Sequence, residues 1–234
     1  MPLLSSPFGR SRDRADHGRR VYNRWSDHQR IYGALVRLAF LERDRAARER
    51  ALSVLDLASG ERVLDIGCGA GVNFDALGAQ VGSGGLVVGL DYSEGMVRAA
   101  RERTPGTPAP TAVCRGDATT LPFADGSFDA AYATLSLSAM ATAETAVEEV
   151  SRVLRPGGRL AVVDARPFQA GLWRALNPLV TPISMLATNW YPEVDILGTI
   201  RSTFDESRVW TTNAGTLYVA VGWKEDEVRR DRLR

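Results

Sequence analysis

The chain has 234 residues, of which 44% are hydrophobic and 24% charged, and its formal net charge is +1. This length and apolar content suit one large α/β domain with additions, and the balanced charge gives no overall field that would attract nucleic acid or a membrane. Cys68 and Cys114, the two cysteines, are too few for a disulfide framework and lack metal-ligand spacing. Because no apolar run reaches the length of a membrane span and residues 1–20 have no apolar signal core, the sequence predicts a cytoplasmic protein without a metal site.

The first 56 residues are predicted to form a tail and a helical segment ahead of the main domain. Residues 1–20 are polar, with two prolines, and are expected to be a loose tail. Residues 21–32 carry three aromatic side chains. Residues 31–55 have helical periodicity with a charged middle, which is either a solvated face or a break between two helices.

Residues 62–71 read Arg-Val-Leu-Asp-Ile-Gly-Cys-Gly-Ala-Gly. The apolar residues predict a short buried strand with Asp65 near its end, followed by a tight glycine turn and a helix from Val72. Such a turn lets backbone N–H groups and the positive end of a helix approach a ligand closely. The dinucleotide fingerprint Gly-x-Gly-x-x-Gly is not met, because Val72 stands at the position of its third glycine.

After this turn, strand and helix signals alternate, which predicts a parallel sheet. Strands are expected at residues 86–90, 112–114, 130–135 and 160–163, and helices at residues 93–103 and 144–154. Residues 167–200 interrupt the alternation: apolar residues keep helical spacing, but two prolines are expected to kink or split any helix there. Residues 208–212 and 216–223 read as a hairpin. The expected fold is a Rossmann-like, doubly wound sheet of seven strands, mostly parallel with a C-terminal antiparallel hairpin and helices on both faces.

Carboxylates follow three of the predicted strands. Asp91 lies about twenty residues beyond the last glycine of the turn, where a carboxylate can accept both hydroxyls of a ribose. Asp117 follows the next strand. Parallel strands share their C-terminal side, so Asp65, Asp91 and Asp117 are expected at one edge of the sheet.

Taken together, Asp-x-Gly-x-Gly-x-Gly at residues 65–71 and the later carboxylates resemble the class I S-adenosylmethionine (SAM) methyltransferases. Two further stretches resemble in particular the branch of this family that acts on quinones and phospholipids: Leu121-Pro122-Phe123 with Ser127-Phe128-Asp129, and Val153-Leu154-Arg155-Pro156-Gly157-Gly158-Arg159-Leu160. The resemblance covers residues 22–164 and the final strand. It departs from the family pattern after the fourth strand, where Ser138 and Ala139 stand in place of a histidine pair.

The resemblance implies SAM as cofactor and a set of residues that bind it. Asp65 would help to hold the methionine end, Asp91 the ribose and Asp117 the adenine amino group, while Met96 would pack on adenine. The full set of expected cofactor residues is Asp65, Gly67, Cys68, Gly69, Gly71, Asp91, Tyr92, Met96, Asp117, Ala118, Thr134, Leu135 and Tyr22.

Tyr22 belongs to the segment Tyr-x-Arg-Trp, which in this branch folds over the cofactor cleft. The alternative is that its aromatic residues pack an N-terminal helix on the sheet. Similarly, residues 167–200 either line a lipophilic acceptor or bury their apolar face on the sheet. Residues 57–234 would then form the SAM-binding domain, with residues 167–200 as an insertion on the acceptor side.

The expected function is SAM-dependent methyl transfer to a small lipophilic or aromatic molecule, such as a quinone precursor, a phospholipid head group or a secondary metabolite. His17 and His28 are the two histidines, and neither is assigned as a catalytic base. The alternatives are a protein that binds SAM without turnover and a nucleotide-dependent oxidoreductase. No nucleic-acid partner is expected, and the protein is predicted to be a monomer or homodimer with at most peripheral membrane contact.

Overall fold

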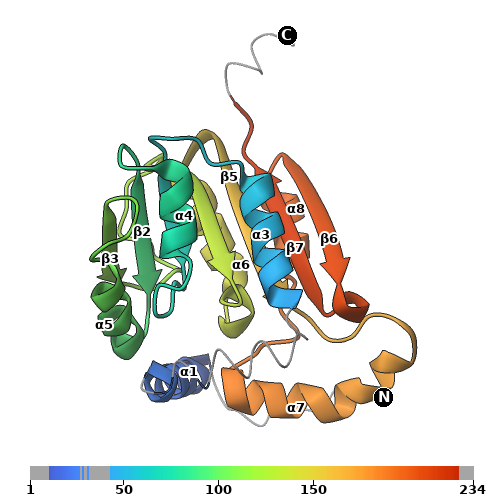
Figure 1. The fold of residues 1–234 in the computed structure, drawn as a ribbon. Helices are drawn as coiled ribbons and strands as arrows, with labels where there is room; N and C mark the ends of the chain where they lie inside the picture. Colours follow the sequence, from blue (N-terminus) through green and yellow to red (C-terminus); the bar gives the residue numbers. More distant parts are fainter. Residues whose placement is uncertain (1–10, 27, 29–30, 32–42, 227–234) are drawn as a thin grey trace.

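The computed structural model describes residues 11–26, 28, 31 and 43–226. Its centre is a seven-stranded sheet with the order β3-β2-β1-β4-β5-β7-β6 (Figure 1). The strands are β1 (Arg62–Ile66), β2 (Leu86–Asp91), β3 (Thr111–Arg115), β4 (Phe128–Thr134), β5 (Leu154–Ala165), β6 (Glu206–Thr212) and β7 (Leu217–Trp223). Strands β1 to β5 are parallel, and β7 is antiparallel to both β5 and β6. The predicted sheet and its C-terminal hairpin are confirmed.

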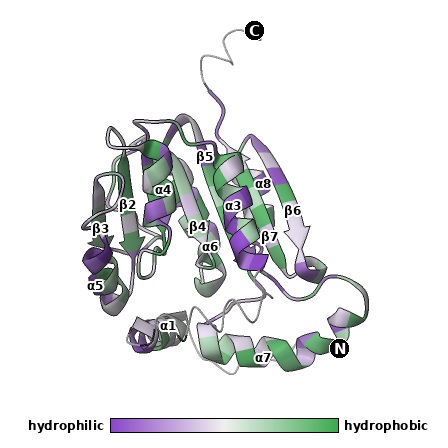
Figure 2. Ribbon diagram, viewed as in Figure 1, coloured by the Kyte–Doolittle hydropathy of each residue, from purple (hydrophilic) through white to green (hydrophobic). Residues whose placement is uncertain are grey.

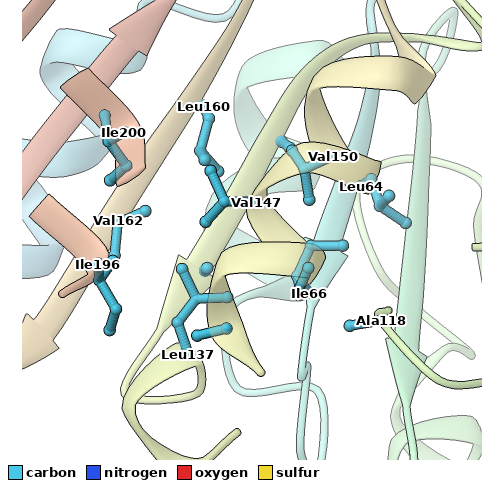
Figure 3. Packing of buried hydrophobic residues seen from close by; sticks show 14 of the residues in the cluster. Leu64, Ile66, Ala118, Leu137, Val147, Val150, Leu160, Val162, Ile196 and Ile200 are labelled. Atoms are coloured by element: carbon cyan, nitrogen blue, oxygen red, sulfur yellow. The ribbon is translucent and has the colours of Figure 1, made fainter. Parts of the chain in front are cut away.

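Helices cover both faces of the sheet, as predicted. One face carries α3 (Arg43–Leu55), α4 (Phe74–Val81) and α5 (Glu94–Arg103), and the other carries α6 (Ala143–Val153) and α8 (Ile196–Thr203). Figure 3 shows the second face, where Val147 and Val150 of α6 pack with Leu160 of β5. The central strands are buried on both sides, which explains why β1 and β4 read as nearly continuous apolar runs.

The remaining helical elements lie at the ends of the strands. Helix α1 (Ser11–Ser26) contacts α5 and α7 (Asn177–Thr188), and the short turn η2 (Gly171–Leu176) leads into α7. Figure 1 shows α1 and α7 extending below the tips of the parallel strands, away from the two helical layers. The other short turns are η1 (Leu137–Ala139) and η3 (Asn213–Gly215).

Several boundaries differ from those predicted. Residues 11–20 belong to α1 and are not a loose tail. The rest of the predicted tail, residues 1–10, lies outside the described residues, and so do residues 32–42 of the predicted second helix, including Tyr32. Helix α3 is continuous through its charged part, because Asp44, Ala47 and Ala51 are buried and Arg48 is half-buried, while its other charged side chains are exposed. Helix α4 begins at Phe74, two residues later than expected, since Gly71 has a positive φ angle and residues 71–73 complete the turn.

Two proline-containing segments also differ. Residues 155–158 end α6 as predicted, but they form a bulge within β5, where the register with β4 shifts opposite Asp129. Helix α7 continues through Pro182. Pro178 lies in the first turn of α7, where a backbone N–H has no partner within the helix. Pro182 removes one backbone hydrogen bond, the one that would be donated to the carbonyl of Pro178.

Residues 167–200 bury their apolar side chains in one part only. No residue of η2 or α7 is buried, whereas Ile196, Leu197 and Ile200 of α8 are. The alternative in which this segment simply covers the sheet is therefore wrong for α7 and right for α8.

No helix within the described residues is both long and apolar enough to cross a membrane.

Gly222 provides a test of the packing between β7 and α8. A Cβ atom at this position would lie 2.6 Å from Cγ of the buried Phe204. Replacement Gly222→Ala is therefore expected to lower the free energy of unfolding by about 1–3 kcal/mol, as measured by denaturant titration. Gly84→Ala is the matched control, because the nearest atom to a Cβ there is 3.9 Å away. Equal stability of the two variants would contradict this packing.

Candidate cofactor site

The glycine turn after β1 adopts a backbone that side chains would block. Gly67, Gly69 and Gly71 have φ angles of +61°, +54° and +76°, in the left-handed region that favours glycine. A Cβ on Gly67 would lie 2.5 Å from Cβ of Ser136, and one on Gly71 would lie 2.5 Å from the ring of Phe74. A Cβ on Gly69 would meet no atom within 4 Å, so the turn presents its middle glycine to open space.

Asp91 connects the end of β2 to this turn. Its carboxylate accepts hydrogen bonds from the backbone N–H of Gly69 at 2.9 Å and from that of Ser93 at 2.8 Å. Burial raises the pKa of Asp91, and the backbone hydrogen bonds oppose that rise. Since the two oxygens of a carboxylate together have about four acceptor sites, at least one remains for ligand hydroxyls.

Asp65 is the centre of a second polar cluster. It is completely buried, and the side-chain amide of Asn73 donates to its two oxygens at 3.2 and 3.1 Å. The same amide donates to the hydroxyl of Thr134 at 3.0 Å. Burial raises the pKa of Asp65 to about 7, although Asn73 and the charge of Arg48 lower it.

Arg48 completes this cluster from α3. Its guanidinium donates to the side-chain oxygen of Asn73 at 2.6 Å and to the hydroxyl of Thr134 at 2.7 Å. The cluster thus links α3, β1, β4 and the residue before α4. A positive and a negative group stand together beside the glycine turn, an arrangement that suits the zwitterionic end of an amino acid.

The other expected cofactor residues occupy different environments. Asp117 is exposed and accepts from the backbone N–H and hydroxyl of Thr119 at 2.9 and 2.7 Å. Met96 and Ala118 are buried, while Tyr92 is 43% exposed. The backbone of Leu135 has a positive φ angle at the end of β4. Cys68 is buried, and burial together with the nearby carboxylates raises the pKa of its thiol, so its side chain belongs to the core.

Tyr22 lies in α1 and donates from its hydroxyl to the carbonyl of Thr188 at 2.8 Å. In the same helix, Asn23 accepts from the hydroxyl of Ser93 at 2.7 Å and from the backbone N–H of Gly95 at 3.4 Å. Helix α1 therefore joins the beginning of α5 to the end of α7. His28 is exposed.

A third buried carboxylate, Asp164, lies near the end of β5. It accepts from the backbone N–H of Ser138 at 2.9 Å and from the hydroxyl of Ser138 at 2.5 Å. The carbonyl of Ser138 in turn accepts from the N–H of Tyr191 at 2.7 Å. Ser138, at a position where the resemblance has histidine, thus fixes the loops after β4 and α7.

A pocket of about 260 Å³ opens beside these groups. Its walls come from the end of β5, the segment before α8 and the start of β7. Tyr191 and Tyr218 are buried side chains in its lining, next to Arg166. The pocket is therefore a candidate for binding a small molecule beyond the glycine turn.

Sequence reasoning missed Arg48, Asn73 and Asp164. Asn73 precedes a helix and looks like an ordinary cap, and nothing in the sequence distinguishes Arg48 from the other arginines. Asp164 ends a predicted strand on the same edge as Asp65 and Asp91, and this shared position was the signal that could have identified it. Among the side chains that the structure places, no group of three His, Cys, Asp or Glu is arranged to hold a metal ion.

Known proteins that are similar to this chain show the family to which it belongs. Residues 64–162 match a family described as a methyltransferase domain. The chain is 34% identical over 213 residues to a demethylmenaquinone methyltransferase of Beutenbergia cavernae, a match that spans 87% of this chain and 82% of the relative. It is 42% identical over 128 residues to an uncharacterized 37.1 kDa protein in transposon Tn4556 of Streptomyces fradiae, covering 55% of this chain and 37% of that protein.

Among solved structures, a SAM-dependent methyltransferase of Thermotoga maritima, described as a possible histamine N-methyltransferase, shares the fold with a TM-score of 0.65 and 21% identity, covering 88% of this chain and 99% of the other. The chain belongs to the class I SAM-dependent methyltransferases, in the branch that includes the quinone methyltransferases. Its cofactor is SAM. The open space at Gly69, the lone pairs of Asp91 and the polar cluster of Asp65 and Arg48 fit the ribose and methionine portions of that molecule.

The role of Asp91 can be measured directly. Replacement Asp91→Ala is expected to weaken SAM binding by about 1–3 kcal/mol, because it removes the acceptor for the ribose hydroxyls. Isothermal titration calorimetry would give the dissociation constant, with exposed Glu102→Ala on α5 as control. If the affinity were unchanged while thermal unfolding matched the unmodified protein, Asp91 would not contact the ribose.

Asp65 should give the folded protein a defined pH dependence. Because its pKa rises from 3.8 to about 7 on folding, the unfolded chain loses this proton first, and the free energy of unfolding falls as pH rises from about 4 through 7. Over that pH range, the difference in free energy of unfolding between the Asp65→Asn variant and the unmodified protein should change by up to about 4 kcal/mol. Denaturant titrations at several pH values would measure it, with exposed Asp75→Asn on α4 as control. Parallel curves for the Asp65→Asn variant and the unmodified protein would contradict the buried carboxyl.

Proposed function

We propose that this enzyme transfers the methyl group of SAM to a small, lipophilic aromatic acceptor, and that a quinone precursor in its reduced, hydroxylated form is the best candidate. The observation that carries the proposal is the match to the Beutenbergia demethylmenaquinone methyltransferase, which extends over 82% of that protein and beyond the cofactor-binding residues. The pocket beside Asp164, with its two buried tyrosines, supports an aromatic acceptor.

The proposed arrangement divides the chain by role. Residues 1–56 would cover the cofactor cleft, residues 57–234 would bind SAM, and residues 167–200 would border the acceptor. Asp117 would accept from the adenine amino group and Tyr22 would lie over the cofactor. The enzyme would act in the cytoplasm as a monomer or homodimer, without a nucleic-acid partner.

SAM supplies a methyl group already activated by the positive charge on sulfur. The contribution expected from this chain is orientation: the glycine turn and Asp91 would fix the nucleoside, while Arg48 and Asp65 would fix the amino acid portion. Bound in this way, SAM would supply its methyl group to a ring carbon of the hydroquinone, its sulfur would keep the electron pair of the bond that breaks, and the displaced ring proton would pass to water. Asp164 is committed to Ser138 and Ala165, and it would position the pocket walls.

The proposal predicts label transfer from methyl-labelled SAM. We expect label in the ring of reduced demethylmenaquinone, and none in phosphatidylethanolamine offered in a parallel reaction. The Asp91→Ala variant at limiting SAM is the control for binding. Label in the phospholipid, or in protein or nucleic acid of a source-cell extract, would show methyl transfer to a different acceptor and contradict the quinone. Bound SAM with no transfer to any of these acceptors would favour a protein that binds the cofactor without turnover.

A further inference from the structure

A continuous row of large apolar side chains lies exposed on η2 and α7. Leu172 and Leu176 lie in η2. Leu179, Ile183 and Leu186 follow in α7 at intervals of four and three residues, which places these three on one face of the α-helix. We name these five residues the apolar stripe. Leu172 is 92% exposed, Leu179 65% and Ile183 60%. Trp173 and Val180 are exposed beside the stripe, and Figure 2 shows α7 as a largely hydrophobic helix separate from the sheet.

The orientation of α7 is the reverse of that usual for a surface helix, which turns its apolar face to the core. Among the described residues, hydrogen bonds hold α7 at both ends. At its start, the side chain of Asn177 accepts from the backbone N–H of Phe168 at 2.9 Å and donates to its carbonyl at 3.1 Å. At its end, the hydroxyl of Tyr22 donates to the carbonyl of Thr188 at 2.8 Å, and the indole N–H of Trp25 donates to the carbonyl of Ala187 at 2.9 Å. Helix α1 is attached to α7 through backbone carbonyls of α7. The apolar side chains of the stripe take no part in these bonds and stay exposed. A contiguous exposed apolar surface of this kind marks an interaction site.

Positive charges predominate near the stripe, since α1 contains five arginines and two aspartates. Residues 167–192 contain no Asp or Glu, and Arg174 is the one charged residue among them. Helix α1, which contacts α7, adds the exposed Arg20 and Arg24. An apolar helix with cationic neighbours and a tryptophan near its start matches the surface of a negatively charged lipid bilayer, where the apolar side chains enter the acyl boundary and the arginines contact phosphates.

We propose that η2 and α7 form a peripheral membrane-docking element for anionic bilayers, in which the apolar stripe enters the lipid interface and Arg20, Arg24 and Arg174 contact lipid phosphate groups. The helix is held across the ends of the parallel strands (Figure 1), so docking would turn the edge that carries the glycine turn toward the membrane. This inference goes beyond the proposed function and is independent of the acceptor, because docking needs no turnover.

Sedimentation with vesicles tests the proposal. The unmodified protein is expected to sediment with vesicles of equal phosphatidylglycerol and phosphatidylcholine, and less with pure phosphatidylcholine or at high salt. The double variant Leu179→Asp, Ile183→Asp should reduce the partition coefficient by at least about tenfold. The matched control, Ser83→Asp with Ser202→Asp, adds the same two charges at exposed positions outside α7 and should bind as the unmodified protein does.

A second variant separates the charge from the apolar contribution. Arg20→Gln with Arg24→Gln should weaken binding to the phosphatidylglycerol vesicles and leave the residual binding to phosphatidylcholine unchanged. SAM affinity and thermal unfolding of each variant show that the fold and cofactor site are intact. Unmodified protein that stays in the supernatant, or undiminished binding by the Leu179/Ile183 variant, would overturn the proposal. So would a dimer in size-exclusion chromatography that this variant converts to a monomer, since the stripe would then be the contact between two copies of the chain.

Discussion

The buried carboxylate of Asp65 imposes a constraint on which the surrounding structure depends. A charge in this position is costly unless it is neutralised or hydrogen-bonded, and the available partners come from elements far apart in the sequence. Asn73 reaches it from the residue before α4, Thr134 connects to Asn73 from the end of β4, and Arg48 reaches both from α3. The cluster therefore fixes four elements relative to one another at the same edge of the sheet. Its placement beside the glycine turn makes that edge both a structural centre and the cofactor site.

The sheet could be predicted from sequence because its signals are local. Apolar runs such as residues 86–90 are buried between two helical layers, and the turn after β1 needs glycine at three positions whose φ angles are positive. The carboxylates Asp65 and Asp91 were expected at one edge because parallel strands must end there. Arg48 could not be predicted, because its role depends on where α3 packs relative to β4. The same limit applies to Ser138, whose bond to Asp164 joins segments 26 residues apart.

The helices outside the two layers were predicted less well, for a related reason. Residues 11–20 are polar and carry no periodic apolar face, so their helix could not be predicted from apolar spacing; hydrogen bonds that attach α1 to α5 and α7 come from Tyr22, Asn23 and Trp25. Residues 177–188 have clear helical spacing, yet periodicity identifies an apolar face without saying what that face contacts. On α8 the face turns to the core, and on α7 it turns outward. The distinction lies in tertiary structure, and it separates an element that stabilises the domain from one available to a partner.

The strand order has a consequence for how the protein is made. Strand β7 (Leu217–Trp223) lies between β5 and β6. The strand that connects the edge strand β6 to the rest of the sheet is therefore a segment near the end of the described chain. During synthesis, β5 has an unpaired edge and β6 has no neighbour until β7 has left the ribosome, because β6 bonds to β7 alone among the described strands. A nascent chain that has folded this far would therefore expose the unpaired edge of β5 until β7 has left the ribosome, a state in which strands of different chains can pair. A chain truncated before β7 would contain every residue of the glycine turn. In that chain, β5 would keep an unpaired edge and β6 would have no partner strand.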